Sequence, residues 1–168
     1  MKGSGTPLVV GIGNILLRDE GVGVRVVREL ELRAADGRLN LPPGTRLLDG
    51  GTLGLELLPT IATASILVLV DSVDLGQPAG SVIVIRDEAI EGILHAHVSP
   101  HQVGVADLVA VARLIGSFPA AASLVGIQPA AIEIGLDLTA AVEAAVPDAL
   151  ARVCAELRRG SKITPAAA

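Results

Sequence analysis

The segment PLVVGIGNILLRDEGVGVRVVREL (residues 7–30) shows how this chain begins its fold. Its first seven residues are apolar and end in a Gly-Ile-Gly turn, which predicts a buried strand followed by a tight turn. The stretch from about residue 21 to 34 then places an apolar residue at every fourth position: Val22, Val26 and Leu30. That spacing is typical of a helix with one buried face, so the chain opens with a strand, a glycine turn and a helix.

The rest of the chain repeats this alternation of short apolar runs and amphipathic runs. Further strands are predicted at 45–51, 65–73, 80–88 and 122–127, and further helices at 53–61, 103–116 and 139–159. Pro59 is expected to bend or end the first of these helices, and Pro147 to kink or divide the last. The run 65–73 is apolar on both faces, as a strand at the centre of a parallel sheet would be.

The third and fourth predicted strands are separated by about half a dozen residues, too few for a crossover helix, so we expect them to pair antiparallel. The predicted fold is therefore a three-layer α/β domain, with a mostly parallel, twisted five-stranded sheet and helices on both faces. Residues 1–160 are expected to form this single domain, and residues 161–168 a disordered tail.

Composition excludes several classes of partner. The net charge is −5 and the only aromatic residue is Phe118, so neither a basic surface nor stacking platforms for nucleic acid are available. The single cysteine, Cys154, lies in an apolar helical pattern and excludes a disulfide framework or a cysteine-based zinc site.

Nothing in the sequence points to a membrane or to export. The N-terminal residues contain no long apolar segment typical of a secretory signal. Residues 114–132 carry no charge, but their glycines and prolines indicate a helix end, a loop and a short strand, so a membrane span is rejected. We expect a cytoplasmic protein.

Acidic residues follow three of the predicted strands. Asp19 and Glu20 come after the first strand, Asp49 lies at the end of the second, and Asp71 at the end of the third. His101 precedes a predicted helix that can begin at the same edge of the sheet. Ligands of open α/β sheets bind outside the carboxyl ends of the strands, so we expect these side chains to converge there.

One interpretation of this edge is a nucleotide site. Gly11-Ile12-Gly13 begins like a dinucleotide-binding fingerprint, and Asp49 could supply the acid after the second strand. The third glycine of that motif should stand at position 16, however, where this chain has Leu16. Asp19 and Glu20 would also repel a pyrophosphate. Nucleotide binding therefore remains the less favoured alternative.

The other interpretation is a metal site formed by Glu20, Asp71 and His101. Two carboxylates and an imidazole suit zinc, nickel or manganese, and three protein ligands leave positions open for water or substrate. Each residue also has an ordinary structural explanation, as a helix-dipole partner, a turn cap or a helix-opening residue. Spacing alone leaves these explanations open. The remaining histidines, His95 and His97, are expected on a surface or loop segment of extended chain.

Five segments of the chain, taken in order, resemble the hydrogenase maturation endopeptidases, which process the C-terminus of nickel–iron hydrogenase large subunits. The segments, within residues 8–155, are GIGNILLRDEGVGVRVV, DGGTLGLELL, VLVDSVDLGQPAGSVIVIRDE, SPHQVGVADLVAVARLIGSFP and LVGIQP. The likeness is greatest to the branch that serves membrane-bound, uptake-type hydrogenases. The fold that this resemblance implies, a twisted mixed sheet between helices, agrees with the pattern.

The resemblance also implies a site. The family's metal-binding and catalytic positions correspond to Glu20 in RDEG, Asp71 in LVLVDS and His101 in SPHQ, with Asp19 and Asp49 as secondary catalytic candidates. The metal would be nickel supplied by the substrate, and zinc or cadmium could occupy the same ligands in a crystal. Whether catalysis is of the aspartic type or depends on the metal is left open by the sequence.

The implied substrate and partner is a folded large-subunit precursor that has already received nickel, cleaved once after a basic residue near its last metal-binding cysteine motif. We expect the protease to act as a monomer, without nucleic acid or membrane. A non-catalytic metal-binding assembly factor with the same three ligands is the alternative.

Overall fold

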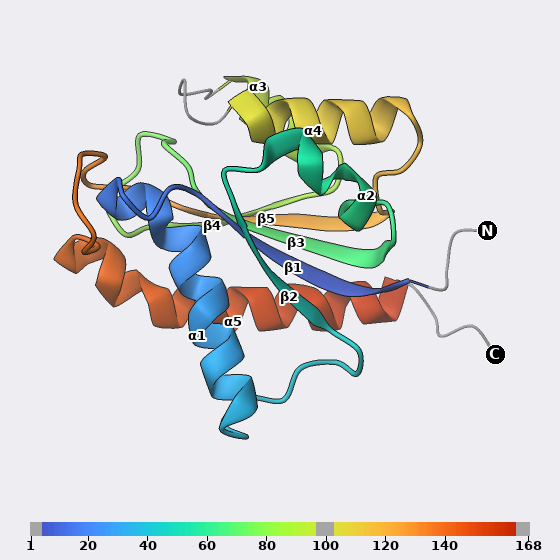
Figure 1. Cartoon of the computed structure of the whole chain (residues 1–168), viewed down its shortest axis with the longest axis horizontal. Helices are drawn as coiled ribbons and strands as arrows, with labels where there is room; N and C mark the ends of the chain where they lie inside the picture. Colours follow the sequence, from blue (N-terminus) through green and yellow to red (C-terminus); the bar gives the residue numbers. More distant parts are fainter. Residues whose placement is uncertain (1–4, 97–102, 164–168) are drawn as a thin grey trace.

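The computed structural model describes residues 5–96 and 103–163 and contains a five-stranded sheet (Figure 1). The strand order is β2-β1-β3-β5-β4. The strands are β1 (Thr6–Ile12), β2 (Arg46–Gly51), β3 (Ala64–Ser72), β4 (Val82–Arg86) and β5 (Ala121–Ile127). The first four in this order run parallel, and the edge strand β4 runs antiparallel to β5. The mixed, mostly parallel sheet predicted from the sequence is confirmed.

Helices cover both faces of the sheet (Figure 1). They are η1 (Arg18–Gly21), α1 (Val22–Ala35), η2 (Gly54–Leu57), α2 (Leu58–Ile61), α3 (Ala89–Ala96), α4 (Val103–Leu114) and α5 (Ala140–Ile163). α1 and α5 bury one face, and η2, α2, α3 and α4 bury the other. This arrangement is the three-layer fold.

The alternation of side chains along the central strands divides the core in two. In β3, Val68 faces the cluster under α1 and α5, whereas Leu67 and Leu69 face the cluster under α2 and α4. All three side chains are fully buried, as expected for a strand that is apolar on both faces. β3 therefore contributes buried side chains to both hydrophobic clusters, one on each face of the sheet.

The expected partner of the fourth strand is wrong. β4 runs antiparallel, but it pairs with β5, which lies between it and β3. The connection at residues 73–81 needs to span only two strand spacings, about 10 Å, which leaves room for β5 to insert later. The short connection between β3 and β4 excluded a crossover helix but did not specify which strand would lie next to β4.

The expectation that His95 lies on extended chain is wrong, because His95 lies in α3, a helix that the sequence interpretation did not include; His97 lies outside the described residues. α5 extends from Ala140 to Ile163 with Pro147 inside it, so Pro147 does not divide the helix.

The rejected membrane span has the predicted structure. Residues 114–132 include the end of α4, a turn and β5. Within the described parts of the chain, no helix is both long enough and apolar enough to cross a bilayer.

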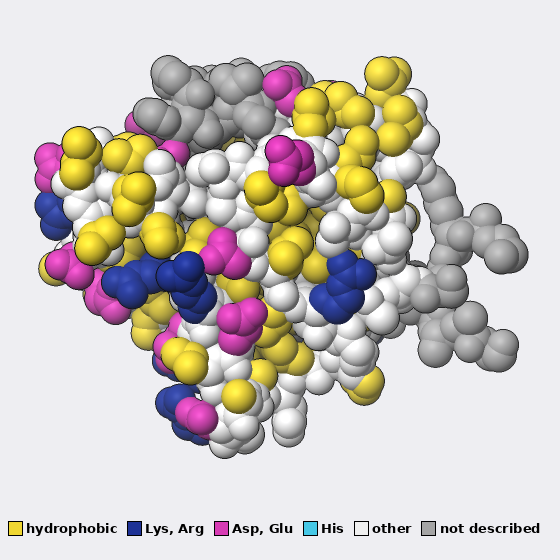
Figure 2. Space-filling view, in the orientation of Figure 1, with side chains coloured by type: hydrophobic (Ala, Val, Ile, Leu, Met, Phe, Trp, Pro, Cys, Tyr) yellow, Lys and Arg dark blue, Asp and Glu magenta, His cyan; other side chains and the backbone are white. Residues whose placement is uncertain are grey.

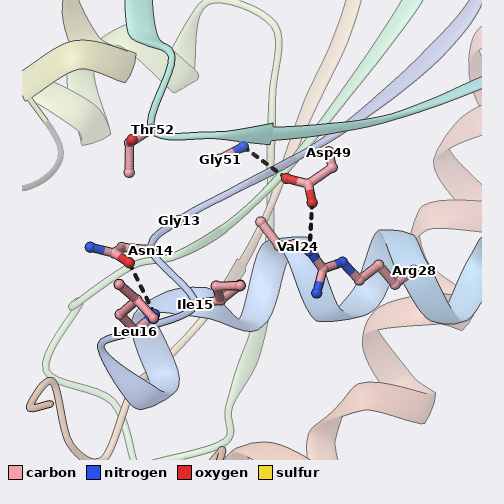
Figure 3. A pocket seen from close by; sticks show the side chains of 9 residues that line it. All are labelled: Gly13, Asn14, Ile15, Leu16, Val24, Arg28, Asp49, Gly51 and Thr52. Atoms are coloured by element: carbon pink, nitrogen blue, oxygen red, sulfur yellow. Dashed lines mark hydrogen bonds and ion pairs between the residues drawn. The ribbon is translucent and has the colours of Figure 1, made fainter. Parts of the chain in front are cut away.

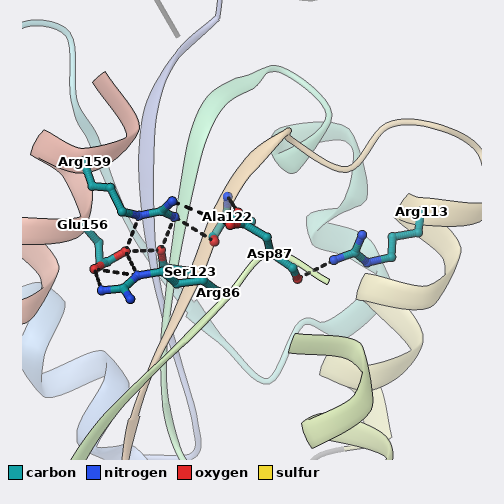
Figure 4. Close-up of polar contacts among 7 residues, drawn as sticks. All are labelled: Arg86, Asp87, Arg113, Ala122, Ser123, Glu156 and Arg159. Atoms are coloured by element: carbon teal, nitrogen blue, oxygen red, sulfur yellow. Dashed lines mark hydrogen bonds and ion pairs between the residues drawn. The ribbon is translucent and has the colours of Figure 1, made fainter. Parts of the chain in front are cut away.

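A buried carboxylate joins α5 to the antiparallel edge of the sheet (Figure 4). Glu156 accepts hydrogen bonds from Arg86 of β4 at 2.6 Å, from Ser123 of β5 at 2.6 Å and from Arg159 at 2.8 Å. Burial alone would raise the pKa of Glu156, but these hydrogen bonds and the Arg86 charge outweigh it and bring the pKa to about 2. The folded state therefore favours the ionised form.

This network predicts a pH-dependent stability difference between the wild type and Glu156→Gln. The folded pKa of about 2 lies below the unfolded value of 4.5, so the carboxylate stabilises the fold above pH 4.5, and that stabilisation disappears as the pH falls toward 2. We expect Glu156→Gln to lower the unfolding free energy at pH 7 by about 1–3 kcal/mol. Urea unfolding at pH 7 and pH 3 measures this.

The exposed Glu143 on the same helix supplies the control, because Glu143→Gln should leave the unfolding midpoint nearly unchanged. A destabilisation by Glu156→Gln that stays constant down to pH 2 would show that the carboxylate charge contributes nothing.

Candidate active site at the carboxyl edge of the sheet

The glycines of the β1–α1 segment bring helix and sheet backbones into direct contact. A Cβ on Gly23 would lie 2.1 Å from the Val70 carbonyl oxygen, and a Cβ on Gly11 would lie 2.3 Å from the Gly23 carbonyl oxygen. Gly13, with φ of 131°, adopts a backbone conformation that other residues rarely reach, and its Cβ position is filled by the Glu20 carbonyl. These glycines therefore pack the helix start onto the ends of β1 and β3.

This packing places Glu20 and Asp71 together. Glu20 lies in η1, immediately before α1, and Asp71 follows Val70 near the end of β3. Both carboxylates are buried, with 6% and 2% of their surface exposed. The charge of Glu20 contributes to the pKa of Asp71, as expected for neighbouring carboxylates.

The two carboxylate oxygens of Asp71 differ in their hydrogen bonding. Its Oδ1 accepts the Ser72 N–H at 2.8 Å, whereas its buried Oδ2 has no hydrogen-bond partner among the described residues. Burial raises the pKa of Asp71 to about 8, the Ser72 N–H opposes this rise, and Glu20 adds to it. A buried carboxylate oxygen beside a second acid fits a bound divalent cation, which would supply the missing positive charge.

The third expected ligand, His101, lies outside the described residues. Within those residues, no group of three or more histidine, cysteine or acidic side chains is arranged to hold a metal ion. The described part of α4 begins at Val103, two residues after His101, and its first turn lies toward the end of the sheet where the parallel strands finish (Figure 1). The assignment of Glu20, Asp71 and His101 as metal ligands therefore stays a prediction.

Asp19, a secondary catalytic candidate, is fully buried and its oxygens are occupied. It accepts hydrogen bonds from the Ala130 and Ala131 N–H groups at 2.9 and 3.0 Å, and from the Thr139 N–H and hydroxyl at 2.7 and 2.8 Å. Burial alone would raise the pKa of Asp19, but these bonds outweigh it and lower the pKa. The geometry gives Asp19 the role of an anchor for the loop after β5.

Asp49, the other secondary candidate, is half-exposed at the edge of a pocket of about 330 Å³ (Figure 3). Its carboxylate accepts hydrogen bonds from Arg28 at 3.0 Å and from the Gly51 N–H at 3.1 Å. The strand β1 lies between Asp49 and Asp71, because Gly11 pairs with Asp49 on one side and Val70 on the other. Asp49 therefore borders the same edge of the sheet without joining the buried pair of acids.

Sequence reasoning did not identify Gln128 as part of this edge. Its buried side-chain oxygen accepts the Leu75 and Gln77 N–H groups at 2.8 and 3.1 Å, and its amide nitrogen donates to Asp74 at 2.9 Å. Gln128 thus fixes the loop that follows β3. A polar residue directly after an apolar strand was the available signal, and it has no distinctive spacing.

Comparison with known proteins agrees with this fold and identifies the family. The hydrogenase maturation protease family matches residues 24–156, a segment that includes Asp71 and begins after Glu20. The chain is 41% identical over 152 residues to the hydrogenase 2 maturation protease of Escherichia coli, covering 90% of each chain. It is 40% identical over 163 residues to the hydrogenase expression/formation protein HupD of Rhodobacter capsulatus, covering 95% of this chain and 75% of HupD.

Solved structures give the same result. The hydrogenase maturating endopeptidase HybD from E. coli superimposes with a TM-score of 0.83 at 40% identity, covering 92% of this chain and 93% of HybD. A hydrogenase 2 maturation peptidase from a Thaumarchaeota archaeon gives 0.68 at 30% identity, covering 91% and 98% of the two chains. The chain belongs to the hydrogenase maturation protease family and is an endopeptidase of that class, so the nucleotide-binding interpretation is set aside.

The contact of α1 with the sheet predicts a large effect of one methyl group. Gly23→Ala would place a carbon 2.1 Å from the Val70 carbonyl oxygen and should lower the unfolding free energy by about 1–3 kcal/mol while displacing Glu20 and reducing proteolysis. Gly92 in α3 is the matched control, because a Cβ there meets no atom within 4 Å. Gly92→Ala should stabilise the helix by up to about 1 kcal/mol.

Urea unfolding and proteolysis assays on both variants test this prediction. Equal stability of Gly23→Ala and the wild type would show that the helix start does not depend on close backbone contact.

Proposed function

We propose that this endopeptidase removes the C-terminal extension from the precursor of a [NiFe] hydrogenase large subunit, and that it recognises nickel already bound in the precursor. This nickel would be bound by Glu20, Asp71 and His101. The enzyme would act in the cytoplasm as a monomer, with the precursor as its partner. The observation that carries the proposal is the buried acid pair with the partnerless Asp71 Oδ2 at the carboxyl edge of the sheet.

The chemistry of this edge supports a role in reading the metal of a substrate. Asp71, whose pKa is raised to about 8 by burial, has one oxygen without a hydrogen-bond partner among the described residues and would be stabilised in its ionised form when a divalent cation arrives. Zinc or cadmium would satisfy the same ligands, so their binding in a crystal would be consistent with a nickel-reading site. A precursor without its cation would leave the Asp71 oxygen without this partner and would bind less tightly.

Binding the nickel would fix the scissile bond relative to the protein. Orientation of this kind contributes to catalysis because the reacting groups no longer lose translational and rotational freedom at the chemical step. The bound cation can also polarise a carbonyl or lower the pKa of a water molecule. In this proposal Glu20 and Asp71 hold the ion, and Asp19 keeps η1 in place through its bonds to the 130–139 loop.

Mass spectrometry of the large subunit tests the proposed activity directly. The wild-type protein should shorten nickel-loaded precursor at its C-terminus and leave nickel-free precursor intact. His101→Ala should abolish cleavage of the loaded precursor without changing the unfolding midpoint. Normal cleavage by His101→Ala would refute the metal grip, and binding without any cleavage by the wild type would favour the assembly-factor alternative.

Asp71→Asn should separate activity from stability. The amide keeps the shape of the side chain but cannot ionise to bind a cation, so we expect at least a hundredfold loss of cleavage, typical of removing one electrostatic catalytic group. The variant should unfold at the same or higher urea concentration than the wild type, because burying a carboxylate is costly. The exposed Asp107 in α4 provides the control, since Asp107→Asn should change neither property.

Full activity of Asp71→Asn would remove Asp71 from the site. Loss of activity together with loss of folding would instead assign Asp71 a structural role.

A further inference from the structure

Four large apolar side chains are exposed together beside the candidate active site. The loop that follows β5 contributes three of them, and the β1–α1 segment contributes the fourth. Their exposed fractions are 41% for Ile132, 92% for Ile134, 67% for Leu136 and 57% for Leu16. We call these four residues the apolar rim. In Figure 2, hydrophobic side chains gather over this loop and over the segment before α1.

Backbone pairing holds the two parts of the apolar rim side by side. The Gly135 N–H donates to the Leu16 carbonyl at 2.9 Å, and the Arg18 N–H donates to the Gly135 carbonyl at 2.9 Å. Leu17 and Gly135 form an isolated parallel bridge. Ile134 and Leu136, which flank Gly135, therefore lie next to Leu16.

Hydrogen bonds with Asp19 and Arg18 fix the loop that carries the apolar rim. Asp19 accepts four hydrogen bonds from residues at the two ends of the loop, and Arg18 donates to the Asp137 carbonyl at 3.2 Å and to Glu133 at 2.8 Å. Ordering a loop normally costs conformational entropy on binding, and here the loop is already ordered by its own contacts. Exposed apolar residues on a fixed loop are suited to protein–protein contact.

The rim borders the site described above. Asp19, which anchors the loop, directly precedes Glu20, and Leu16 lines the same pocket as Asp49 (Figure 3). A protein seated on the rim would therefore also reach the carboxyl edge of the sheet. Arg18 of η1 and Glu133 of the loop form an ion pair at 2.8 Å, and the exposed Asp137 adds one further negative charge to this surface.

We propose that the apolar rim is the docking surface for the precursor, contacting an apolar patch of the precursor next to its scissile segment. This inference rests on the proposed function. Continuity with the site identifies the occupant, because a second copy of this chain on the rim would cover the edge that a large substrate must reach. The contact supplies binding energy outside the metal ligands and presents the scissile segment to them.

Ile134→Asp tests the docking surface, with Leu114→Asp as the matched control. The two side chains are similarly exposed, 92% for Ile134 and 86% for Leu114. Leu114, however, is the last residue of α4 and lies away from the loop (Figure 1). We expect Ile134→Asp to raise KM for nickel-loaded precursor about tenfold, the usual scale for one interface hot spot, with kcat changed less than twofold. Leu114→Asp should leave both constants unchanged.

The outcomes are distinguishable. A tenfold weaker association of Ile134→Asp with precursor in analytical ultracentrifugation, at normal kcat, supports the docking surface. Unchanged KM for both variants overturns it, as does conversion of a dimeric wild type into a monomer with cleavage unaltered, which would assign the rim to self-association. If the wild type does not cleave the precursor but Ile134→Asp still binds it less well, the proposed function fails and the docking surface stands.

Discussion

The site depends on one steric constraint, the direct contact of the α1 backbone with the ends of β1 and β3. A methyl group at Gly11 or Gly23 would overlap a backbone carbonyl, so the helix can come this close only because both residues lack a side chain. The same contact places η1, and with it Glu20, against the end of β3 where Asp71 lies. Glycines that resemble a phosphate cradle in the sequence thus serve to join a helix to a sheet.

The aspartates at this edge, Asp19, Asp49 and Asp71, differ in burial and hydrogen bonding, and these differences give them different roles. Asp19 and Asp71 are both buried, yet the pKa of Asp19 is lowered by four hydrogen bonds and that of Asp71 is raised to about 8 by burial. Asp49 remains half-exposed and is paired with Arg28. A fully hydrogen-bonded carboxylate stabilises the fold, whereas a buried carboxylate with an oxygen left over is costly in the free protein and is retained where a ligand can use it.

Much of this architecture could be predicted from local sequence, because apolar periodicity specifies each strand and helix. All five strands and the helices α1, α4 and α5 follow that pattern, and Glu20 and Asp71 are candidate ligands because they stand near the ends of buried strands. The partner of β4 could not be predicted, because pairing at a sheet edge depends on where β5 inserts. The roles of Asp19 and Gln128 were equally inaccessible, since their hydrogen-bond partners lie more than fifty residues away in the chain.

Asp19 also connects the proposed docking surface to the candidate metal ligands. It fixes the loop that carries Ile134, and it is adjacent to Glu20, so the apolar rim and the candidate metal ligand belong to one hydrogen-bonded unit. A partner that docks on the rim is then held at a fixed distance from the acid pair, and docking energy can be used to position the scissile bond. Two separate requirements, a matching surface and a bound cation, would have to be met at once. If the proposed function is right, a protease that acts once on a nickel-loaded precursor would gain its selectivity from that combination.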